Sequence, residues 1–320
     1  MDALSQILRV VQLSGAFFVN ARFTAPWCYH SPQASVAAPL LEPGAENVVV
    51  FHLVAAGECL IQVDGQPPIA ARAGDVLLLP RGCAHLMSSE PGLTPPSGVN
   101  LRRLLACRPR RLAYGGGGAP TRIVCGYLGC DRRLASLLLH GLPQVVKVSL
   151  RDCAAGAWLE ASVDYALAES RMPRPGGAGV QAKLAELLFI EVLRQYAHEH
   201  SGQSGWLAGL EDRIVGVALN VLHQHPAQDW TLEELARASG TSRTVLAERF
   251  QNIVGTSPIQ YLTQWRMVMA ANLLRASDAP LARIAEQVGY QNDTSFSRAF
   301  RREYGRPPAA WRRNRSRQLQ

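Results

Sequence analysis

The last third of the chain contains one short sequence unit twice, and this repeat limits the possible folds more than any other feature. Leu235-Ala236 followed by Gly240 recurs 49 residues later as Ile284-Ala285 followed by Gly289. Positions after the turn then repeat at an offset of 50 residues, which pairs Leu246 with Phe296, Phe250 with Phe300, Gly255 with Gly305, Pro258 with Pro308 and Tyr261 with Trp311. A fixed period of this length indicates one supersecondary unit that occurs twice.

Each copy has the signals of a helix, a tight turn and a second helix. Thr231 and Glu234 form a capping box at the start of the first helix. Gly240 permits the positive φ angle that a short turn requires, and Ser242 is a favourable N-cap for the second helix. The second copy has matching signals at Pro280, Gly289 and Asn292. We predict two helix-turn-helix units with an apolar side formed by Val245, Leu246, Phe250, Phe296 and Phe300.

The segment between the two units is apolar at helical spacing from Pro258 to about Arg275. Eighteen residues at 1.5 Å each give a rod of about 27 Å, which is close to the ~34 Å of one DNA turn. One chain is therefore expected to place both second helices in successive major grooves of double-stranded DNA. The residues expected to face the DNA are Arg243, Thr244, Glu248, Arg249, Gln251, Asn292, Thr294, Ser295, Arg298 and Arg302.

The charge balance supports a polyanionic partner. The net charge is +8, and 31 of the 33 basic residues are arginines. Residues 205–320 contain 15 arginines against 10 acidic residues. A run of charge alone indicates a solvated surface, but charge on a repeated helix-turn-helix unit favours DNA binding.

Length and composition indicate a globular protein with more than one domain. The 320 residues are about twice the ~150 residues of an average domain. Hydrophobic residues make up 48% and charged residues 18%, and no apolar run reaches the ~18 residues of a membrane span. The first 19 residues do not have the pattern of a signal peptide. We therefore expect a cytoplasmic protein without a membrane partner, whose seven cysteines are not a secreted disulfide framework.

The first half of the chain has the pattern of a β-domain followed by helices. Short strands separated by turns are expected from about Asn47 to Leu128, with Asp64-Gly65 as a hairpin turn. Residues 132–200 have helical periodicity, and a leucine stripe at Leu184, Leu187, Leu188 and Val192 suits either a homodimer contact or packing against the β-domain. The expected domains are 1–130, a sensor barrel; 131–204, a helical dimerisation and linker region; and 205–320, the DNA-binding domain.

The second repeat unit resembles the most specific motif of the AraC/XylS family of bacterial transcription regulators. The matching residues are Gly289-Tyr290, Phe296 to Phe300, Gly305 and Pro308, with Trp311 where a tyrosine is more usual. This resemblance covers about residues 205–320 and identifies 242–253 and 292–303 as recognition helices. It implies a sequence-specific regulator of transcription that binds double-stranded DNA, with RNA polymerase as a further partner and a homodimer as the expected assembly.

The N-terminal half is similar to a cupin barrel. Gly74 to His85 matches the second cupin motif, and His52 to Gly65 matches the first except that Val54 replaces its second histidine. The fold class is therefore expected to be α+β, an N-terminal cupin-like β-barrel with packed helices followed by an all-α domain. His52, Glu58 and His85 supply the residue types of a facial-triad metal site. Because cupins of this regulator family commonly lose the metal, we expect no cofactor and no enzyme activity.

The alternative is a metal-dependent cupin oxygenase fused to a DNA-binding module, with a divalent metal at His52, Glu58 and His85. The N-terminal half also resembles an AraC subgroup with members that respond to reactive chlorine or other electrophiles. For an oxidant signal, the candidate thiols are Cys125 with Cys130, Cys28 or Cys83 as the second sulfur. Arginines near in sequence, Arg122, Arg132 and Arg133, favour a thiolate. A small organic effector bound near His52, Glu58 and His85 is the other expected signal.

Overall fold

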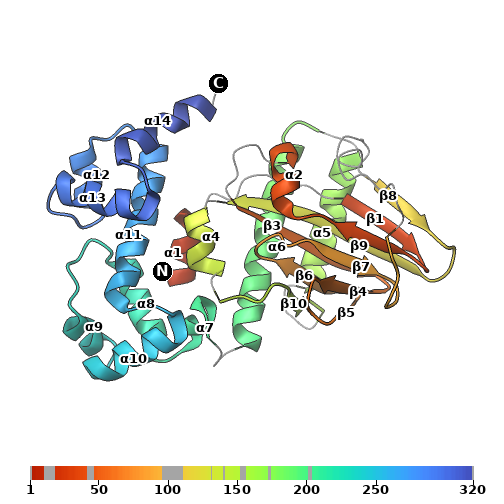
Figure 1. Ribbon diagram of the computed structural model, residues 1–320, viewed down its shortest axis with the longest axis horizontal. Helices are drawn as coiled ribbons and strands as arrows, with labels where there is room; N and C mark the ends of the chain where they lie inside the picture. Colours follow the sequence, from red (N-terminus) through yellow and green to blue (C-terminus); the bar gives the residue numbers. More distant parts are fainter. Residues whose placement is uncertain are drawn as a thin grey trace. The chain divides into compact units, whose positions relative to one another are not determined.

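Two units make up the chain in the computed structural model (Figure 1). The structure describes residues 2–10, 19–41, 47–95, 111–130, 132–139, 141–151, 156–171, 174–200 and 204–318. The barrel unit consists of residues 13–135 and 142–199, and the DNA-binding unit consists of residues 1–12, 136–141 and 200–320. The predicted α+β fold is confirmed, with a sheet-rich barrel unit and an all-helical DNA-binding unit. Residues 1–12 were expected to belong with the barrel but group with the helical unit.

The barrel unit contains a six-stranded and a four-stranded sheet. The larger sheet has the order β10-β6-β3-β9-β1-β8 and the smaller one has the order β2-β7-β4-β5. The strands are β1 (Val19–Thr24), β2 (Cys28–Ser31), β3 (Asn47–Ala56), β4 (Glu58–Val63), β5 (Ile69–Arg72), β6 (Asp75–Leu79), β7 (His85–Ser88), β8 (Arg111–Gly115), β9 (Pro120–Cys130) and β10 (Val146–Ser149). The expected hairpin turn is present, since Gly65 has φ of 76° between β4 and β5.

The register of the strands determines which side chains enter the barrel. On β3, His52 lies opposite Leu77 of β6 and Cys125 of β9. Paired residues of neighbouring strands point to the same face, so these three side chains share the inner side. Cys125 and Leu77 pack in the main barrel core, which also contains Phe23, Trp27, Val54, Cys59, Ile61, Leu79, Met87 and Ile123.

Helices cover the barrel unit from outside. They are α2 (Ala34–Leu41), α5 (Gly156–Arg171) and α6 (Gly177–Glu199), while α4 (Arg132–Leu139) is shared between the two divisions of the chain. Helix α6 packs on β9 and β10, and α5 packs on α6. The leucine stripe expected on α6 is mostly core, because Leu188 and Val192 are buried whereas Leu187 is exposed.

The DNA-binding unit consists of helices only. They are α1 (Ala3–Val10), α7 (Trp206–Glu211), α8 (Val215–Gln224), α9 (Leu232–Ala238), α10 (Arg243–Val254), α11 (Pro258–Ala276), α12 (Leu281–Gln287), α13 (Asp293–Tyr304) and α14 (Pro308–Gln318). The capping box at Thr231 and Glu234 forms, and both second helices are N-capped, by Ser242 on α10 and Asn292 on α13. The predicted α9–α10 and α12–α13 units are joined by the 19-residue α11.

The first helix of the chain packs into the DNA-binding unit. Helix α1 contacts α8 and α11, and its residues Ala3 and Ile7 are fully buried. The backbone N–H of Ala3 donates a hydrogen bond of 2.7 Å to the side-chain oxygen of Asn220 on α8. The side chain of Asp2 accepts the N–H of Ser5 and caps the helix. A segment far from residues 205–320 in sequence therefore completes their core.

Tyr261 holds three helices of this unit together. Its buried hydroxyl accepts a hydrogen bond of 2.6 Å from the Trp206 indole on α7 and lies 2.7 Å from Nε2 of His223 on α8. Burial lowers the pKa of His223 to about 3, so the imidazole is neutral. The Tyr261 ring also contacts Phe250 of α10 edge-on at 5.7 Å. This network fixes the second helix of the first repeat relative to α11.

No helix in the described part of the chain is long and apolar enough to span a membrane.

Candidate DNA interface and barrel interior

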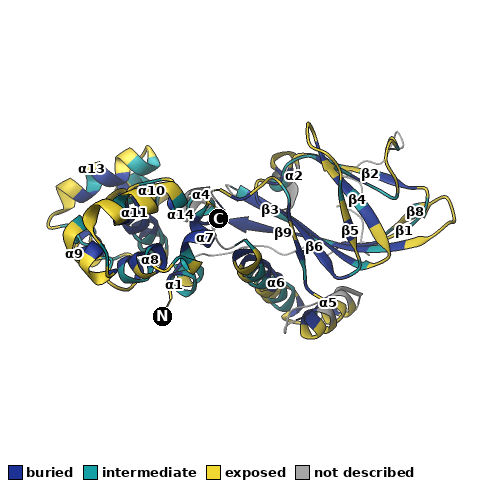
Figure 2. Ribbon diagram, turned by 90° about the horizontal axis from the view of Figure 1, so that it is seen from below, coloured by how far each residue is buried: buried dark blue, intermediate teal, exposed yellow. Residues whose placement is uncertain are grey.

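The two second helices, α10 and α13, present the residues that the sequence assigns to DNA. All ten of these residues are exposed, and the exposed side of α10 and α13 is visible in Figure 2. On α13 the arginines Arg298, Arg301 and Arg302 are exposed while Phe296 and Phe300 are buried. Arg301 is an additional exposed cation on this helix, beyond the residues that the sequence assigns to DNA. Their roles in DNA recognition stay predictions.

Arg249 differs from the other candidates because its side chain is already engaged. Its guanidinium forms a forked ion pair with Asp212, with Nε–Oδ2 and Nη2–Oδ2 distances of 2.9 and 2.6 Å. The same carboxylate accepts the backbone N–H groups of Ile214 and Val215 at the start of α8. Arg249 therefore anchors α10 to the α7–α8 junction, and we assign it an anchoring role ahead of base contact.

We predicted that Val245 lies in the core, and this prediction is wrong. Its side chain is 44% exposed in the first turn of α10. Helical periodicity alone did not distinguish it from the adjacent Leu246, which is fully buried. An exposed apolar side chain at this position is suited to contact a thymine methyl group in the major groove. The equivalent residue of the second copy is the polar Ser295.

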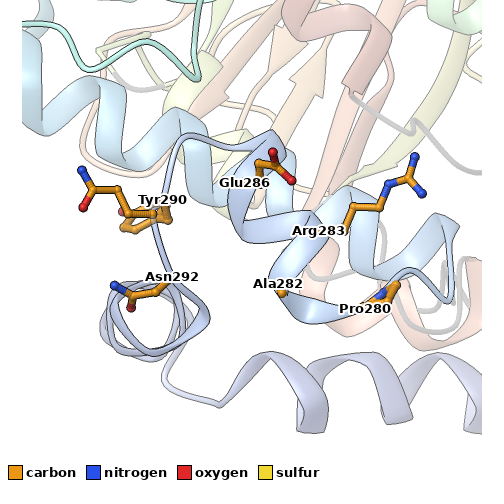
Figure 3. A pocket seen from close by; sticks show the side chains of 7 residues that line it. Pro280, Ala282, Arg283, Glu286, Tyr290 and Asn292 are labelled. Atoms are coloured by element: carbon orange, nitrogen blue, oxygen red, sulfur yellow. The ribbon is translucent and has the colours of Figure 1, made fainter.

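A pocket of about 920 Å³ lies beside the start of α13. In Figure 3, Tyr290 and Asn292 line one side, and Pro280, Ala282, Arg283 and Glu286 of the α12 region line the other. The pocket is part of the second helix-turn-helix unit. Its exposed polar residues come from α12, Arg283 and Glu286, and from the turn before α13, Gln291 and Asn292.

Inside the barrel, His52 and His85 form a buried imidazole pair. Their Nε2 atoms are 2.8 Å apart, and Nδ1 of His85 lies 2.8 Å from the carbonyl oxygen of Cys83. Because a carbonyl only accepts, neutral His85 is protonated on Nδ1 and its bare Nε2 accepts from His52. The remaining Nδ1 atom of His52 is a buried acceptor without a hydrogen-bond partner in the described part of the chain.

Glu58 does not join these two histidines. It is exposed at the start of β4, where the next residue, Cys59, is the one that packs in the barrel core. Side chains alternate along a strand, so the carboxylate of Glu58 lies on the opposite face. Within the described residues no group of three His, Cys, Asp or Glu side chains is placed to hold a metal ion. The proposed set of His52, Glu58 and His85 therefore does not fit a facial-triad metal.

The predicted pairing of Cys125 with Cys130 is wrong for this fold. Both lie on the continuous strand β9, so five residues of about 3.3 Å separate their Cα atoms by about 16 Å. A disulfide requires a Cα separation below about 7 Å. The Sγ of Cys28 bonds to the carbonyl of Leu93, and Cys83 is partly exposed beside His85. No cysteine among the described residues forms a disulfide.

We expected nearby arginines to activate the thiol of Cys125, and the structure contradicts this expectation. Burial, together with the charge of nearby Cys59, raises the pKa of this thiol to about 12. Arg122 does not counter this, because it points away from the barrel core and forms an ion pair of 2.8 Å with Asp164 on α5. The side chains of Arg132 and Arg133 lie outside the described residues. Cys59, whose pKa burial also raises to about 12, is the neighbouring thiol that sequence spacing did not reveal.

The buried imidazole pair makes the barrel unit sensitive to acid. Burial lowers the pKa of His85 to about 4 and that of His52 well below its usual value. Both groups bind protons in the unfolded chain near pH 6.5 but not in the folded one, so stability decreases as the pH falls from 6.5 toward 4. Each imidazole contributes up to about 1.4 kcal/mol per pH unit.

Urea unfolding between pH 7.5 and 4.5 measures this loss. The double variant H52Q/H85Q is expected to have a shallower dependence of its unfolding free energy on pH than the wild type. H198Q is the matched control, because His198 is an exposed histidine on α6. Equal slopes for the double variant and the wild type would contradict this assignment.

Comparison with known proteins agrees with both units. A cupin family model matches residues 2–198, and a helix-turn-helix domain model matches residues 235–314. A putative AraC-like transcription regulator of Streptomyces lividans is 36% identical over 275 residues, 84% of this chain and 88% of that protein. The RCS-specific transcriptional activator RclR of Escherichia coli K12 is 26% identical over 320 residues, 100% of this chain and 99% of that protein.

Among solved structures, the DNA-binding domain of AdpA in complex with a target DNA is 29% identical, covers 34% of this chain and 98% of that chain, and has a TM-score of 0.32. Taken with the two-unit geometry, the matches over most of the sequence establish the family. The chain belongs to the AraC-type family of DNA-binding transcription regulators and contains an N-terminal cupin domain.

Proposed function

We propose that this regulator reads a two-part site on double-stranded DNA, with α10 in one major groove and α13 in the next. The observation that carries this proposal is the pair of N-capped, arginine-bearing helices joined by α11. A 19-residue helix is about 28 Å long, near the ~34 Å between grooves on one face of DNA. From the family we add RNA polymerase as a partner. Because the ligand of the regulator is chromosomal DNA, we also propose that the protein is located in the cytoplasm.

The two helices carry different chemistry at equivalent positions. Glu248 of α10 corresponds to Arg298 of α13, and Val245 corresponds to Ser295. Carboxylates accept hydrogen bonds from cytosine, whereas arginine prefers guanine. The two halves of the site are therefore expected to differ in sequence, so that a single chain binds DNA in one orientation.

We further propose that an oxidant reaches the regulator through the thiols inside the barrel. Cys59 and Cys125 pack in the same core cluster, and the charge of one influences the pKa of the other. RclR, which is similar over the whole chain, is named as RCS-specific. Hypochlorous acid would convert the first thiol to a sulfenyl chloride and water, and the second thiol would then displace chloride to give a disulfide and a proton.

The high pKa of both thiols makes this input selective. Hydrogen peroxide reacts with thiolates, which are scarce near neutral pH when the pKa is about 12. Hypochlorous acid is a stronger oxidant that also attacks neutral sulfur. Cys28 and Cys83 remain alternative second sulfurs in the same barrel unit.

A small organic effector is the second candidate signal. Two buried polar atoms at the barrel interior have no hydrogen-bond partner in the described structure, Nδ1 of His52 and Nε1 of Trp27. One is an acceptor and the other a donor. Unpaired buried groups are costly, so an effector that carried both a donor and an acceptor would be bound favourably there.

We propose that α5 mediates a homodimer. Its outer side carries an exposed stripe of apolar residues at heptad spacing, Trp158, Ala161, Tyr165 and Ala168. Antiparallel pairing of two copies about a two-fold axis places each aromatic ring opposite an alanine of the partner, Trp158 against Ala168 and Tyr165 against Ala161. Asp164, which lies on the same side, is neutralised by Arg122, so it does not repel its symmetry mate.

Replacement of a base-reading arginine is expected to weaken specific binding. R243A and R298A should each reduce affinity by ~1–3 kcal/mol, because a bidentate arginine–guanine contact is lost. The probe is a duplex selected in vitro by the wild-type chain, and binding is measured by fluorescence anisotropy. R237A is the control, since Arg237 is 76% exposed on α9 outside the recognition helices. Wild-type affinity of both variants would exclude α10 and α13 as readers.

Hypochlorite, but not an equal dose of peroxide, is expected to change DNA affinity several-fold in a way that dithiothreitol reverses. C125S and C59S should abolish the change, since either removes one of the two sulfurs. C130S is the matched control, because Cys130 is a buried thiol on the same strand that faces the other side. An unchanged affinity after hypochlorite would reject the thiol signal and favour the organic effector.

Disruption of the α5 stripe is expected to convert a dimer to a monomer in sedimentation velocity. W158E places a charge opposite Ala168 of the partner, and A161W places a large ring opposite Tyr165. V36E is the control, because Val36 is an exposed apolar residue on α2 outside the stripe. A monomeric wild type, or a dimeric W158E variant, would contradict the proposed interface.

A further inference from the structure

Arg266 is a buried cation at the centre of the DNA-binding unit. It lies on α11 and is 9% exposed. Its Nε atom donates a hydrogen bond of 2.7 Å to the carbonyl of Pro226, and Nη2 donates one of 2.8 Å to the carbonyl of Gln228. These carbonyls belong to the turn that joins α8 to α9, the entrance to the first helix-turn-helix unit. Burial lowers the pKa of Arg266.

The other side of Arg266 faces the second helix-turn-helix unit. Its guanidinium carbon is 5.8 Å from the centre of the Tyr290 ring, in the turn between α12 and α13. A cation over an aromatic face is attracted by the ring quadrupole. One side chain of the connecting helix therefore binds a turn of the first unit and a turn of the second.

The α8–α9 turn and the α12–α13 turn are also in direct contact, at Gly289. A Cβ added at Gly289 would lie 2.7 Å from the carbonyl oxygen of Ala227 and 2.8 Å from Nη2 of Arg266. A Cβ added at Gly240, the equivalent residue of the first copy, would meet no atom within 4 Å. Both glycines have positive φ, 82° and 63°. The first turn needs glycine for its backbone angle alone, while the second also needs it for close approach.

We infer that Arg266 and Gly289 lock the two helix-turn-helix units in one relative orientation, so that the regulator accepts only one spacing between its two half-sites. This inference rests on the proposed two-part DNA site. Helix α11 sets the distance between the units, and the contact at the turns sets their rotation about it. Arg266 is thus a positioning residue for DNA recognition that touches no base.

The spacing of the half-sites is the property that this lock controls. One inserted base pair rotates the second half-site by about 35° and shifts it along the DNA axis, because B-DNA has 10–10.5 base pairs per turn. Two units in a fixed orientation cannot follow that rotation and lose the contacts of one helix. Units that rotate about α11 retain part of them.

The test compares duplexes that contain both selected half-sites at the selected spacing, and with one base pair added or removed. The wild type is expected to lose roughly 10-fold or more in affinity on either change. R266M keeps the aliphatic stem but loses both hydrogen bonds. For this variant, the decrease in affinity on either change of spacing should be no more than about 3-fold. R237M is the control, because it removes an exposed arginine outside this contact. Binding to a single half-site, which needs no lock, should be the same for R266M and the wild type.

A pair of glycine variants separates the contact from backbone strain. G289A and G240A both place a side chain at positive φ, but only G289A forces the two turns apart. Only G289A is expected to relax the spacing requirement, whereas both lower the melting temperature. The lock is overturned if folded R266M and G289A discriminate spacing as strongly as the wild type. A wild-type chain that selects no two-part site would instead reject the proposed DNA recognition itself.

Discussion

The burial of α11 is the constraint on which the DNA-binding unit depends. Each helix-turn-helix unit is too short to bury a core of its own, and α11 supplies apolar surface to both. Its first half packs Tyr261, Leu262 and Trp265 around the first unit, and its second half packs against Phe296 and Phe300 of the second unit. A single continuous helix therefore supplies the shared core and also sets the distance between α10 and α13. Stability and DNA geometry cannot vary independently in this design.

The barrel unit depends on a different constraint, the neutral state of the histidines and thiols in its interior. The two histidines and two thiols of its interior are all held in their neutral forms by burial. A charged or polar product formed there is costly unless the surrounding strands rearrange. A signal that changed the chemistry of a few interior atoms would thereby change the packing in the barrel. This property suits the proposed sensor.

Sequence patterns predicted the helical unit better than the barrel. The repeat and its capping residues specify α9, α10, α12 and α13 because those signals are local in sequence. The strands β1, β2 and β10 lie outside the segment in which we expected strands, and β10 lies where we predicted helices. Pairing partners far away in sequence determine all three strands. Cys130 was paired with Cys125 because spacing does not show whether a strand turns back between two positions.

The roles of individual site residues depend in the same way on partners far away in sequence. Glu58 is the correct residue type for a metal ligand, but the alternation along β4 directs it away from the histidines. Arg249 is exposed and basic, as a DNA contact requires, yet Asp212 from 37 residues earlier holds its guanidinium. Arg266 has no sequence signal at all, because its acceptors are main-chain carbonyls. Residue type and spacing identify candidates, and only tertiary partners decide their roles.

DNA specificity would be set at two levels, within one chain and between the two chains of the proposed dimer. Within one chain, the proposed lock of α11 and the turns around Arg266 would fix the relation of two different half-sites. The sequence that is read would then be long and directional. Between chains, a dimer formed through α5 would set the relation of two such composite sites by contacts of the barrel unit alone. A signal inside the barrel would then act on how two chains are paired without disturbing how either one reads its bases. On these proposals, recognition and regulation would depend on different units of the chain.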